Sequence, residues 1–541
     1  MPQSATDTSL PVSWGESLRD PVLWAILLMV SFLLFYNLGG RPLWQDEAET
    51  ANLGRNVLRF GLEPKVFDGL NVVSQEETRE FGPDMVWRWS PWFQIYMSAV
   101  SQAVFGYGAA EARALFAVGG VLCVGLTYLL IRRRFGDKGW ARMSAFLLAV
   151  SVPFLLFARM GRYYAYGGVL VLVTLFCFRG RWRDSSLSLA VLVLSLGLLF
   201  HANYLLFISY APCLLLGALL LYRDELPLSR VALVGILTAI LVVPGFFMYR
   251  LTNQGGMFNI LVIPQNVIDY LADFFMYIVP LPVFAALTWR WLPVAFRGAP
   301  RDPGERFCLF LALNVVGAIA IMALIPQRFH RYMAHLYPWC AIILGWATVR
   351  LWRYFKPAGA LLCILMAATN WLNVLPMEKL HIVNRPWQND SHQLTWSNIP
   401  LRLFLTELVC GYPDVNAALI DFFNKNARPG EVILAEYGDM VLQYYTPFRI
   451  IGGLQGAIDP SLKPDWISVR HEVRVNRDRI LFDSKAATMF RLDLDNDYDR
   501  IDLASADEAF GNREDPQYHY FIPLAEPVQH LVIYRKKGIR P

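Results

Sequence analysis

Long uninterrupted apolar runs constrain this chain more than any other feature. A run of about 20 apolar residues is long enough to cross a lipid bilayer as a helix. Hydrophobic residues make up 55% of the 541 residues and charged residues only 17%, whereas a soluble chain carries about a quarter charged residues. Runs that reach or approach the required length are 21–38, 115–131, 141–158, 164–178, 186–201, 204–222, 231–249, 267–289, 307–325, 333–349 and 357–375. We therefore expect a polytopic α-helical membrane protein with about eleven transmembrane helices.

The apolar runs stop near Leu375, and the rest of the chain has an ordinary soluble composition. Helices are indicated over 414–424, with Asp414 as the cap, and over 439–445; strands are indicated over 432–434, 466–469 and 531–534. Alternating helices and strands are typical of an α/β domain. The sequence thus predicts a transmembrane domain over 1–375 and an external α/β domain over 376–541, which assists acceptor recognition or forms a structural lid.

Lys and Arg residues are distributed unevenly between the two sides of the predicted spans. Seventeen lie in one set of alternate loops: Arg132, Arg133, Arg134, Lys138, Arg142, Arg179, Arg181, Arg183, Arg223, Arg230, Arg290, Arg297, Arg301, Arg306, Arg350, Arg353 and Lys356. Only five lie in the short loops on the other side: Arg159, Arg162, Arg250, Arg328 and Arg331. Because cytoplasmic loops carry the excess of positive charge, we expect a cytoplasmic N-terminus. The loop 40–96 and the tail are then external, which in a bacterium means the periplasmic side of the inner membrane.

The external loop 40–96 begins with an amphipathic pattern. Apolar residues recur at three- and four-residue steps after Glu47, and Gly61 is a plausible helix stop. Such a helix would lie at the membrane interface directly after the first span. Asp46 stands at its start, where an acid can cap the helix or act as a general base at the membrane surface.

Tryptophans crowd the same loop at positions 44, 87, 89 and 92. Aromatic residues are enriched at membrane interfaces for reasons unrelated to catalysis, but their faces also stack on sugars. The five arginines of the short external loops also allow two interpretations. Each can anchor a lipid headgroup, and as a group they can form an anion site.

Several short motifs, in a fixed order, resemble those of GT-C glycosyltransferases. Residues 41–48 read RPLWQDEA and resemble the P-L-x-x-D-E-A start of the first external loop in that family. Further matches are residues 90–96 (SPWFQIY), 105–113 (FGYGAAEAR), 132–136 (RRRFG), 162–165 (RYYA) and 328–338 (RFHRYMAHLYP). The nearest group is the protein-mannosyltransferase-like and aminoarabinose-transferase-like set, including the RgtA/B/C/D-like domain, and the resemblance covers residues 20–350.

The resemblance implies roles for particular residues. Asp46 corresponds to the catalytic base of the family, and Glu47 is its motif partner. The family often has Lys or His before its P-P segment, whereas this chain has Trp89 and Ser90 there, beside Arg88. The expected ligands of the donor phosphate are therefore Arg162, Arg331, Arg88 and Lys65. The expected substrate-binding residues are Trp44, Trp89, Tyr163, His201, His330 and Tyr332.

His201 is singled out by topology as well, because it falls in a polar cluster at the outer junction of two spans. A polar cluster between apolar spans is costly and marks a site candidate; the alternative is a short exposed turn. No cysteine pair has the CxxC spacing of a zinc or redox site, and no P-loop or GxGxxG motif occurs. The acidic run 493–499 fails the EF-hand pattern, because its sixth position is Tyr498 rather than Gly.

These inferences predict a membrane glycosyltransferase that moves a sugar from a polyprenyl-phosphate donor to an external lipid, glycan or protein hydroxyl. No obligatory cofactor or metal is expected. The expected partners are membrane lipids, the lipid-linked donor and the acceptor, and not nucleic acid. The alternatives are a transporter or flippase of lipid-linked sugars, which would not need a carboxylate at Asp46, an oligosaccharide polymerase or ligase using diphosphate-linked donors, and a noncatalytic membrane scaffold.

Overall fold

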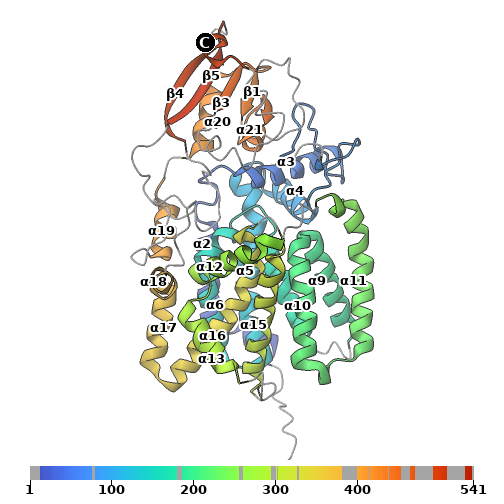
Figure 1. The fold of residues 1–541 in the computed structure, drawn as a ribbon, viewed down its shortest axis with the longest axis vertical. Helices are drawn as coiled ribbons and strands as arrows, with labels where there is room; N and C mark the ends of the chain where they lie inside the picture. The colour runs from blue at the N-terminus through green and yellow to red at the C-terminus, as the bar shows by residue number, and fades with distance from the viewer. Residues whose placement is uncertain are drawn as a thin grey trace, which may run out of the picture.

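A computed structural model describes residues 12–75, 79–178, 185–254, 260–293, 300, 302–325, 328–380, 399–411, 414–435, 438–452, 464–469, 492–507 and 530–538. Its helical body, in the lower part of Figure 1, is formed by α1 (Trp14–Leu18), α2 (Pro21–Phe35), α3 (Gln45–Phe60), α4 (Phe93–Phe105), α5 (Ala109–Phe135), α6 (Lys138–Ala149), α7 (Val152–Ala158), α8 (Tyr164–Phe178), α9 (Ser186–Ala202), α10 (Tyr204–Tyr222), η3 (Arg223–Glu225), α11 (Leu228–Met248), η4 (Leu251–Asn253), η5 (Ile260–Val262), α12 (Ile263–Tyr277), α13 (Leu281–Trp291), α15 (Pro303–Met322), η6 (His330–Leu336), α16 (Tyr337–Tyr354), α17 (Lys356–Ala368), α18 (Trp371–Lys379) and α19 (Pro400–Val409). The tail adds α20 (Val415–Asn426), β1 (Val432–Ala435), α21 (Asp439–Tyr445), β2 (Arg449–Gly452), β3 (Trp466–Val469), α25 (Leu494–Asp497), β4 (Tyr498–Ala506) and β5 (His530–Lys536).

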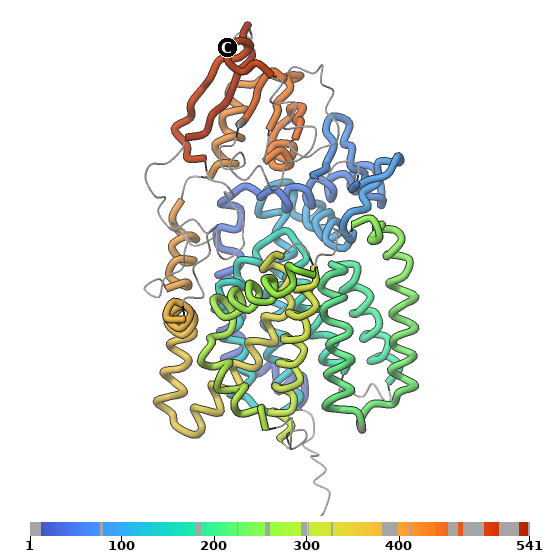
Figure 2. Tube along the Cα trace, in the orientation of Figure 1, coloured from blue at the N-terminus to red at the C-terminus, as the bar shows by residue number. Residues whose placement is uncertain are grey.

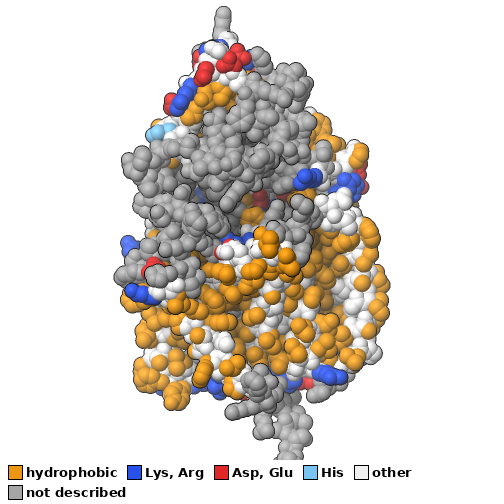
Figure 3. All heavy atoms as spheres, viewed as in Figure 1, with side chains coloured by type: hydrophobic (Ala, Val, Ile, Leu, Met, Phe, Trp, Pro, Cys, Tyr) orange, Lys and Arg blue, Asp and Glu red, His pale blue; other side chains and the backbone are white. Residues whose placement is uncertain are grey.

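The surface of the helical body is apolar where a bilayer would surround it. Apolar side chains cover most of the lower half of the face seen in Figure 3, and Lys and Arg gather along its lower edge. On α11, Ile236, Ile240 and Phe247 are exposed. A helix that is apolar on its exposed side as well as its packed side is suited to lipid rather than water. The chain is thus built as a membrane protein.

Among the described residues, four helices are long and apolar enough to cross a membrane, and up to seven spans result if each bent pair counts as one. The four are α5, α10, α11 and α15, and shorter apolar helices include α2, α8 and α9. The count of about eleven spans stays a prediction. Five arginines of the orientation argument lie outside the described residues: Arg179, Arg181, Arg183, Arg297 and Arg301.

Three pairs of consecutive apolar helices are sharply bent. The axis turns by 65° between α6 and α7, by 109° between α12 and α13, and by 81° between α17 and α18. Pro153 lies at the start of α7, and Pro280 precedes α13; proline lacks an N–H and therefore favours such breaks. Irregular backbone at membrane depth is tolerated where protein or a cavity surrounds it.

The tail forms a five-stranded mixed sheet in the order β2-β1-β3-β5-β4. Strands β2, β1 and β3 are parallel, whereas β5 runs antiparallel to both β3 and β4. Leu419 and Phe423 of α20 and Leu442 of α21 pack against Ile433 and Trp466 of the sheet. The helices and strands predicted in the tail are confirmed, and the Asp414 side chain caps α20 by accepting the Ala417 N–H at 2.9 Å.

Helices α3 and α4 lie between the other helices of the helical body and the sheet, as Figure 2 shows. One apolar core joins them to the tail: Leu53 of α3 and Ile95 of α4 are buried in the same cluster as Met440 and Val441 of α21. The predicted helix after the first span is α3, and Gly61 ends it with a φ of 104°, which glycine adopts without strain. Helix α3 is thus packed against α4 on one side and against α21 of the tail on the other.

The capping interpretation of Asp46 is wrong. The N-cap of α3 is Trp44, and the helix begins at Gln45, so Asp46 lies within the first turn. The reason is Glu47, whose carboxylate accepts the backbone N–H of Trp44 at 3.3 Å. A side chain at the third helical position that reaches back in this way starts the helix earlier, and the Asp46 side chain is left for other contacts.

Candidate active site

The first turn of α3 directs its two neighbouring carboxylates to different surroundings, because consecutive residues of a helix point about 100° apart. The Glu47 side chain has no exposed surface and pairs with Arg113 of α5, with nitrogen–oxygen distances of 2.8 and 2.5 Å. It also accepts the Gly161 N–H at 2.7 Å. Glu47 therefore joins α3, α5 and the connection between α7 and α8.

Asp46 faces two charged side chains and one amide, which come from three distant segments. Nη1 of Arg331, at the start of η6, lies 3.0 Å from Oδ2 of Asp46, and Nη2 of Arg162 lies 3.8 Å from the same oxygen. Its other oxygen lies 3.4 Å from Nε2 of Gln75. The Asp46 side chain keeps 16% of its surface exposed, so a small group can reach it. The structure brings together Asp46, Arg162 and Arg331, as the sequence predicts.

Glu49 completes this group, which we name the carboxylate–arginine cluster: Asp46, Glu49, Arg162 and Arg331. Oε1 of Glu49 lies 3.3 Å from Nη1 of Arg162, and Oε2 accepts a hydrogen bond of 2.5 Å from Gln75. Burial, opposed by Arg162 and reinforced by the charge of Asp46, raises the pKa of Glu49 to about 7. Sequence reasoning missed Glu49, although its spacing of three residues from Asp46 places both on one helix face.

Arg162 is the buried centre of the cluster. Its Nη1 donates to the Asp46 carbonyl at 2.9 Å and to the Thr50 hydroxyl at 2.8 Å, in addition to its contact with Glu49. Burial by itself would lower the pKa of Arg162, but the combined effects of Asp46, Tyr164, Glu49 and Tyr163 outweigh it and leave that pKa above its usual value. Arg162 thus stays fully charged in a site with little water.

Aromatic side chains surround the two guanidinium groups. The Arg331 guanidinium lies 5.6 Å from the centre of the Trp44 ring and 4.2 Å from that of Phe329. Tyr163 is buried, with its ring 5.9 Å from the Arg162 guanidinium. Tyr332 is close enough to Arg331 for the two side chains to hydrogen-bond. Of the predicted substrate-binding residues, Trp44, Tyr163 and Tyr332 therefore lie at the cluster.

Arg88 and Lys65 belong to a second group, the loop cluster: Lys65, Asp84, Arg88 and Arg250. Nη2 of Arg88 lies 2.5 Å from a carboxylate oxygen of Asp84, and Lys65 donates to the Asp84 carbonyl at 3.2 Å. A Cβ added at Gly82 would lie 3.0 Å from Arg250 and 3.6 Å from Arg88, so these two guanidinium groups flank that glycine. Sequence reasoning counted Arg250 among the outer arginines but did not assign it to the site.

The backbone around the loop cluster is strained at two residues, and the segment after α11 is bonded to the same loop. Met85 and Arg250 have φ values of 59° and 50°, in the left-handed region that non-glycine residues seldom occupy. Gln254 donates a hydrogen bond of 2.6 Å to the Trp89 carbonyl, which joins the loop 61–92 to the segment that follows α11 (Figure 2). Trp89 is half-buried and lies at this junction.

His201 lies in the last turn of α9, with both ring nitrogens engaged. Nδ1 lies 2.8 Å from the Tyr249 hydroxyl, and Nε2 lies 3.1 Å from the Leu241 carbonyl of α11. The ring therefore joins α9 to α11. These contacts set His201 apart from the carboxylate–arginine cluster in the described structure.

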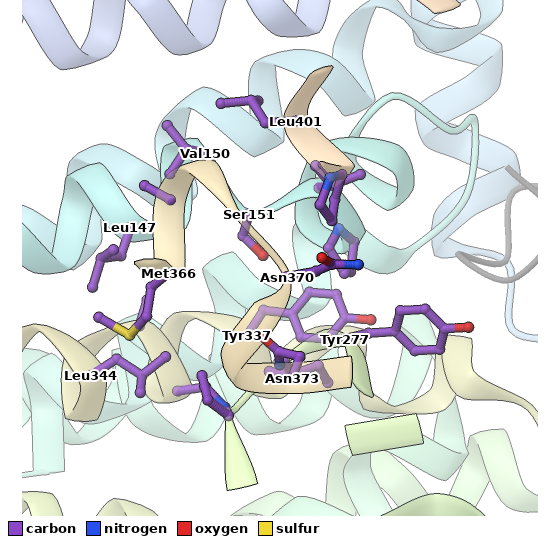
Figure 4. A pocket seen from close by; sticks show the side chains of 18 of the residues that line it. Leu147, Val150, Ser151, Tyr277, Tyr337, Leu344, Met366, Asn370, Asn373 and Leu401 are labelled. Atoms are coloured by element: carbon purple, nitrogen blue, oxygen red, sulfur yellow. The ribbon is translucent and has the colours of Figure 1, made fainter. Parts of the chain in front are cut away.

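His330, the residue before Arg331, is buried. Its Nε2 lies 2.8 Å from the Tyr337 hydroxyl, and its ring centre lies 5.4 Å from that of Tyr277. Both tyrosines line a cavity of about 90 Å³ inside the helical body (Figure 4), where Ser151 and Asn370 mark two of the three helix breaks. His330 therefore contacts two residues of the cavity wall.

The tail reaches the site through α21. Oδ1 of Asp439 accepts a hydrogen bond of 2.5 Å from Gln45, the residue before Asp46. Asn52 donates to the Met440 carbonyl at 2.9 Å, and the Leu43 N–H donates to the Tyr445 hydroxyl at 3.0 Å. The position of the first turn of α3 therefore depends on both regions of the chain.

Within the part of the chain that the structure describes, no group of three or more His, Cys, Asp or Glu side chains is arranged to hold a metal ion. The acidic run 493–499 includes α25, where Asp493 caps the turn by accepting the Asn496 N–H at 3.1 Å.

The overall structure is similar to two crystal structures of ArnT from Cupriavidus metallidurans, one bound to undecaprenyl phosphate and one in the apo state, each with a TM-score of 0.53. Sequence identities are 16% and 15%, and the alignments cover 80% and 88% of this chain and 85% and 91% of ArnT. A third similar structure is the apo oligosaccharyltransferase of Archaeoglobus fulgidus, with a TM-score of 0.46, 14% identity, and coverage of 95% of this chain and 76% of that one.

ArnT is a GT-C glycosyltransferase, and the chain shares its fold over most of the length of both proteins. The GT-C fold expected from the motif resemblance is therefore confirmed. No family model matches the sequence. Over 135 residues the chain is 31% identical to an uncharacterised protein of Aquifex aeolicus, and the match spans 25% of this chain and about a quarter (24%) of that relative.

Proposed function

We propose that this protein is a membrane glycosyltransferase that moves a sugar from a polyprenyl-phosphate donor to a hydroxyl of an external lipid, glycan or protein. The observation that carries the proposal is the contact of Asp46 with two guanidinium groups at the partly open end of an interface helix. A base beside two fixed positive charges is what transfer from a phosphate leaving group requires. The ArnT structure with bound undecaprenyl phosphate supports a lipid-linked donor.

In the proposed reaction the acceptor oxygen attacks the anomeric carbon of the donor sugar. The new oxygen–carbon bond forms as the bond from that carbon to the phosphate oxygen breaks. The acceptor proton passes to Asp46, and the electron pair of the broken bond leaves with the polyprenyl phosphate. Arg162 and Arg331 stabilise the added negative charge, since guanidinium groups bind two phosphate oxygens at once.

The ion pair of Asp46 with Arg331 suits this sequence of events. A carboxylate that is paired with a cation is a weak base, so the pair must loosen before Asp46 can take a proton. A donor phosphate competes for Arg331 and Arg162 and would free Asp46 as it binds. The acceptor would thus be deprotonated only when the donor is in place.

The other predicted residues are assigned supporting roles in the proposal. Glu47 is a positioning residue, because its buried pair with Arg113 fixes the turn that carries Asp46. The loop cluster supplies further positive charge for an anionic substrate, with Arg88 and Lys65 as expected and Arg250 in addition. Trp44, Tyr163 and Tyr332 offer surfaces for the sugar, and His330, His201 and Trp89 hold the segments around it.

We further propose a bacterial inner-membrane location, with the N-terminus in the cytoplasm and an external α/β domain over 376–541 that helps to recognise the acceptor. A reporter fused after Arg350 should be cytoplasmic, and one fused after Asn389 should be external. A cytoplasmic tail would contradict the proposed side of the site and with it the mechanism.

Purified protein in liposomes, supplied with a radiolabelled polyprenyl-phosphate sugar, tests the activity. We expect the label to move to an acceptor in an extract of the cell envelope and polyprenyl phosphate to be released in equal amount. Movement of intact donor across the bilayer without release of polyprenyl phosphate would instead identify a transporter. The glycan or lipid that changes mass when the gene is deleted identifies the acceptor.

A further inference from the structure

Glu49 holds one of the two cations of the proposed donor site. Nη1 of Arg162 is shared among Glu49, the Asp46 carbonyl and the Thr50 hydroxyl, at 3.3, 2.9 and 2.8 Å. A phosphate that binds Arg162 must therefore compete with a carboxylate that is 95% buried and cannot move into solvent. The sequence motifs assign no role to this residue.

The charges of the carboxylate–arginine cluster balance when all four side chains are ionised. Two carboxylates, Asp46 and Glu49, face two guanidinium groups, Arg162 and Arg331. A phosphodiester brings one more negative charge into a site with little water, where an unbalanced charge is costly. One proton on Glu49 would restore the balance, because the cluster would then carry one net positive charge.

Gln75 allows Glu49 to exist in either form. Its side-chain amide lies 2.5 Å from Oε2 of Glu49 and 3.4 Å from Oδ1 of Asp46. An amide offers a donor on one side and an acceptor on the other. Turned one way it donates to the carboxylate, and turned the other way it accepts from the carboxylic acid, so a protonated Glu49 keeps a hydrogen-bond partner.

The described surroundings of Glu49 contain few other charges that could substitute for it. Burial is the main reason for its raised pKa, and Asp46 adds to the effect while Arg162 opposes it. The charged and titratable groups packed around α3 and Gln75 are otherwise engaged: Arg113 with Glu47, Asp439 with Gln45, Arg55 with Asp68, the buried Glu80 with the Gln75 N–H, Tyr444 with Gly108, Tyr445 with Leu43, and Tyr96 with Leu62.

We propose that Glu49 is a positioning residue that takes up one proton from solvent when the anionic donor binds, releasing Arg162 to the donor phosphate. The inference rests on the proposed function and deepens it. No bond is made or broken except the one between the proton and Glu49. Because Glu49 is ionised above about pH 7, the donor should bind most tightly below that pH and progressively less tightly above it.

The test measures binding of the methyl ester of undecaprenyl phosphate, a sugar-free phosphodiester with one fixed charge, to the purified full-length protein in nanodiscs. Above the pKa of Glu49 the wild-type Kd should rise about tenfold per pH unit, whereas the Kd of Glu49→Gln should change less than about twofold over the same range. Calorimetry at a pH well above the pKa of Glu49, in buffers of different ionisation enthalpy, should detect about one proton taken up by the wild type and none by Glu49→Gln. The matched control is Asp421→Asn, the same chemical change at an exposed carboxylate paired with Lys425.

Three results would overturn the inference. The first is a wild-type Kd that does not change with pH, and the second is a Glu49→Gln variant with the wild-type pH slope. The third, which needs no variant and so remains decisive if Glu49→Gln fails to fold, is an absence of proton uptake by the wild type. A wild type that fails to bind the phosphodiester at any pH overturns the proposed function as well, whereas binding without proton uptake overturns only the role of Glu49.

Discussion

The two sides of the first turn of α3 carry the same functional group in different surroundings. On one side, Glu47 has no exposed surface, and its oxygens accept from Arg113, Gly161 and Trp44. On the other, Asp46 is partly exposed, contacts the guanidinium groups of Arg162 and Arg331, and shares the first of these with Glu49. A carboxylate whose oxygens are all bonded inside the protein fixes a structure, whereas one with looser contacts and access from outside can exchange partners. Neighbouring positions in a motif can therefore have different roles.

The largest effect should come from Asp46→Asn. The substitution keeps the shape and removes the base, and because Asp46 does not cap α3, the helix should form normally. Turnover should fall by about 10²–10⁴-fold, the usual size of a general-base contribution, while the amount of protein in the membrane stays normal. Sugar transfer from purified polyprenyl-phosphate donor in liposomes measures it. A fully active variant would remove Asp46 from catalysis and favour the transporter.

Glu47→Gln, on the buried side of the turn, should lower the stability of the protein. Removing one partner of a buried ion pair leaves Arg113 with an uncompensated charge and costs about 3–5 kcal/mol in the free energy of unfolding. Thermal unfolding in detergent and the level of protein in the membrane are the measurements. A variant that is as stable as the wild type but inactive would mean that the roles of Asp46 and Glu47 are reversed.

Arg331→Ala should weaken use of the donor more than use of the acceptor. Loss of a charge-assisted contact to the phosphate costs about 1.5–3 kcal/mol, seen as a higher KM for the donor. Arg328→Ala is the matched control, since Arg328 pairs with Asp269 and Asp273 rather than with Asp46; it should lower stability without changing the KM for the donor. Unchanged donor dependence in both Arg331→Ala and Arg162→Ala would exclude these residues as the phosphate ligands.

Local signals in the sequence predicted much of the fold. The periodicity after Glu47 and the stop at Gly61 gave α3, and the cap at Asp414 gave α20. The antiparallel edge of the sheet was not predicted, because residues 470–491 and 508–529, which separate β3 from β4 and β4 from β5, carry no pattern that fixes how those strands pair. The three helix breaks were missed as well, since an apolar run reads the same whether or not it bends.

The candidate site was predictable where a motif marked a residue and not where only the fold brings residues together. Asp46, Arg162 and Arg331 were expected as a group from their motifs and common side of the membrane, and they meet. Glu49 was missed because its partner Arg162 is 113 positions away in the chain. Asp46 does not cap α3 because the Glu47 side chain reaches back to the Trp44 N–H. Composition does not reveal such a contact between a side chain and the backbone.

The smallest effect should come from Tyr445→Phe, which tests whether the tail helps to place the Asp46 side of the turn. The variant removes the hydroxyl that accepts the N–H of Leu43, a buried donor three residues before Asp46, at a cost of about 1–3 kcal/mol in stability. If the tail positions the turn, kcat should fall a few-fold while the KM for the donor stays unchanged. Tyr498→Phe is the matched control, because its hydroxyl donates to the Pro464 carbonyl at 2.9 Å within the sheet, away from α3. Both variants should lower the unfolding temperature, but only Tyr445→Phe should lower kcat. Equal losses of kcat in the two would show that the tail acts through overall stability, so that the position of Asp46 is set by the helical body alone.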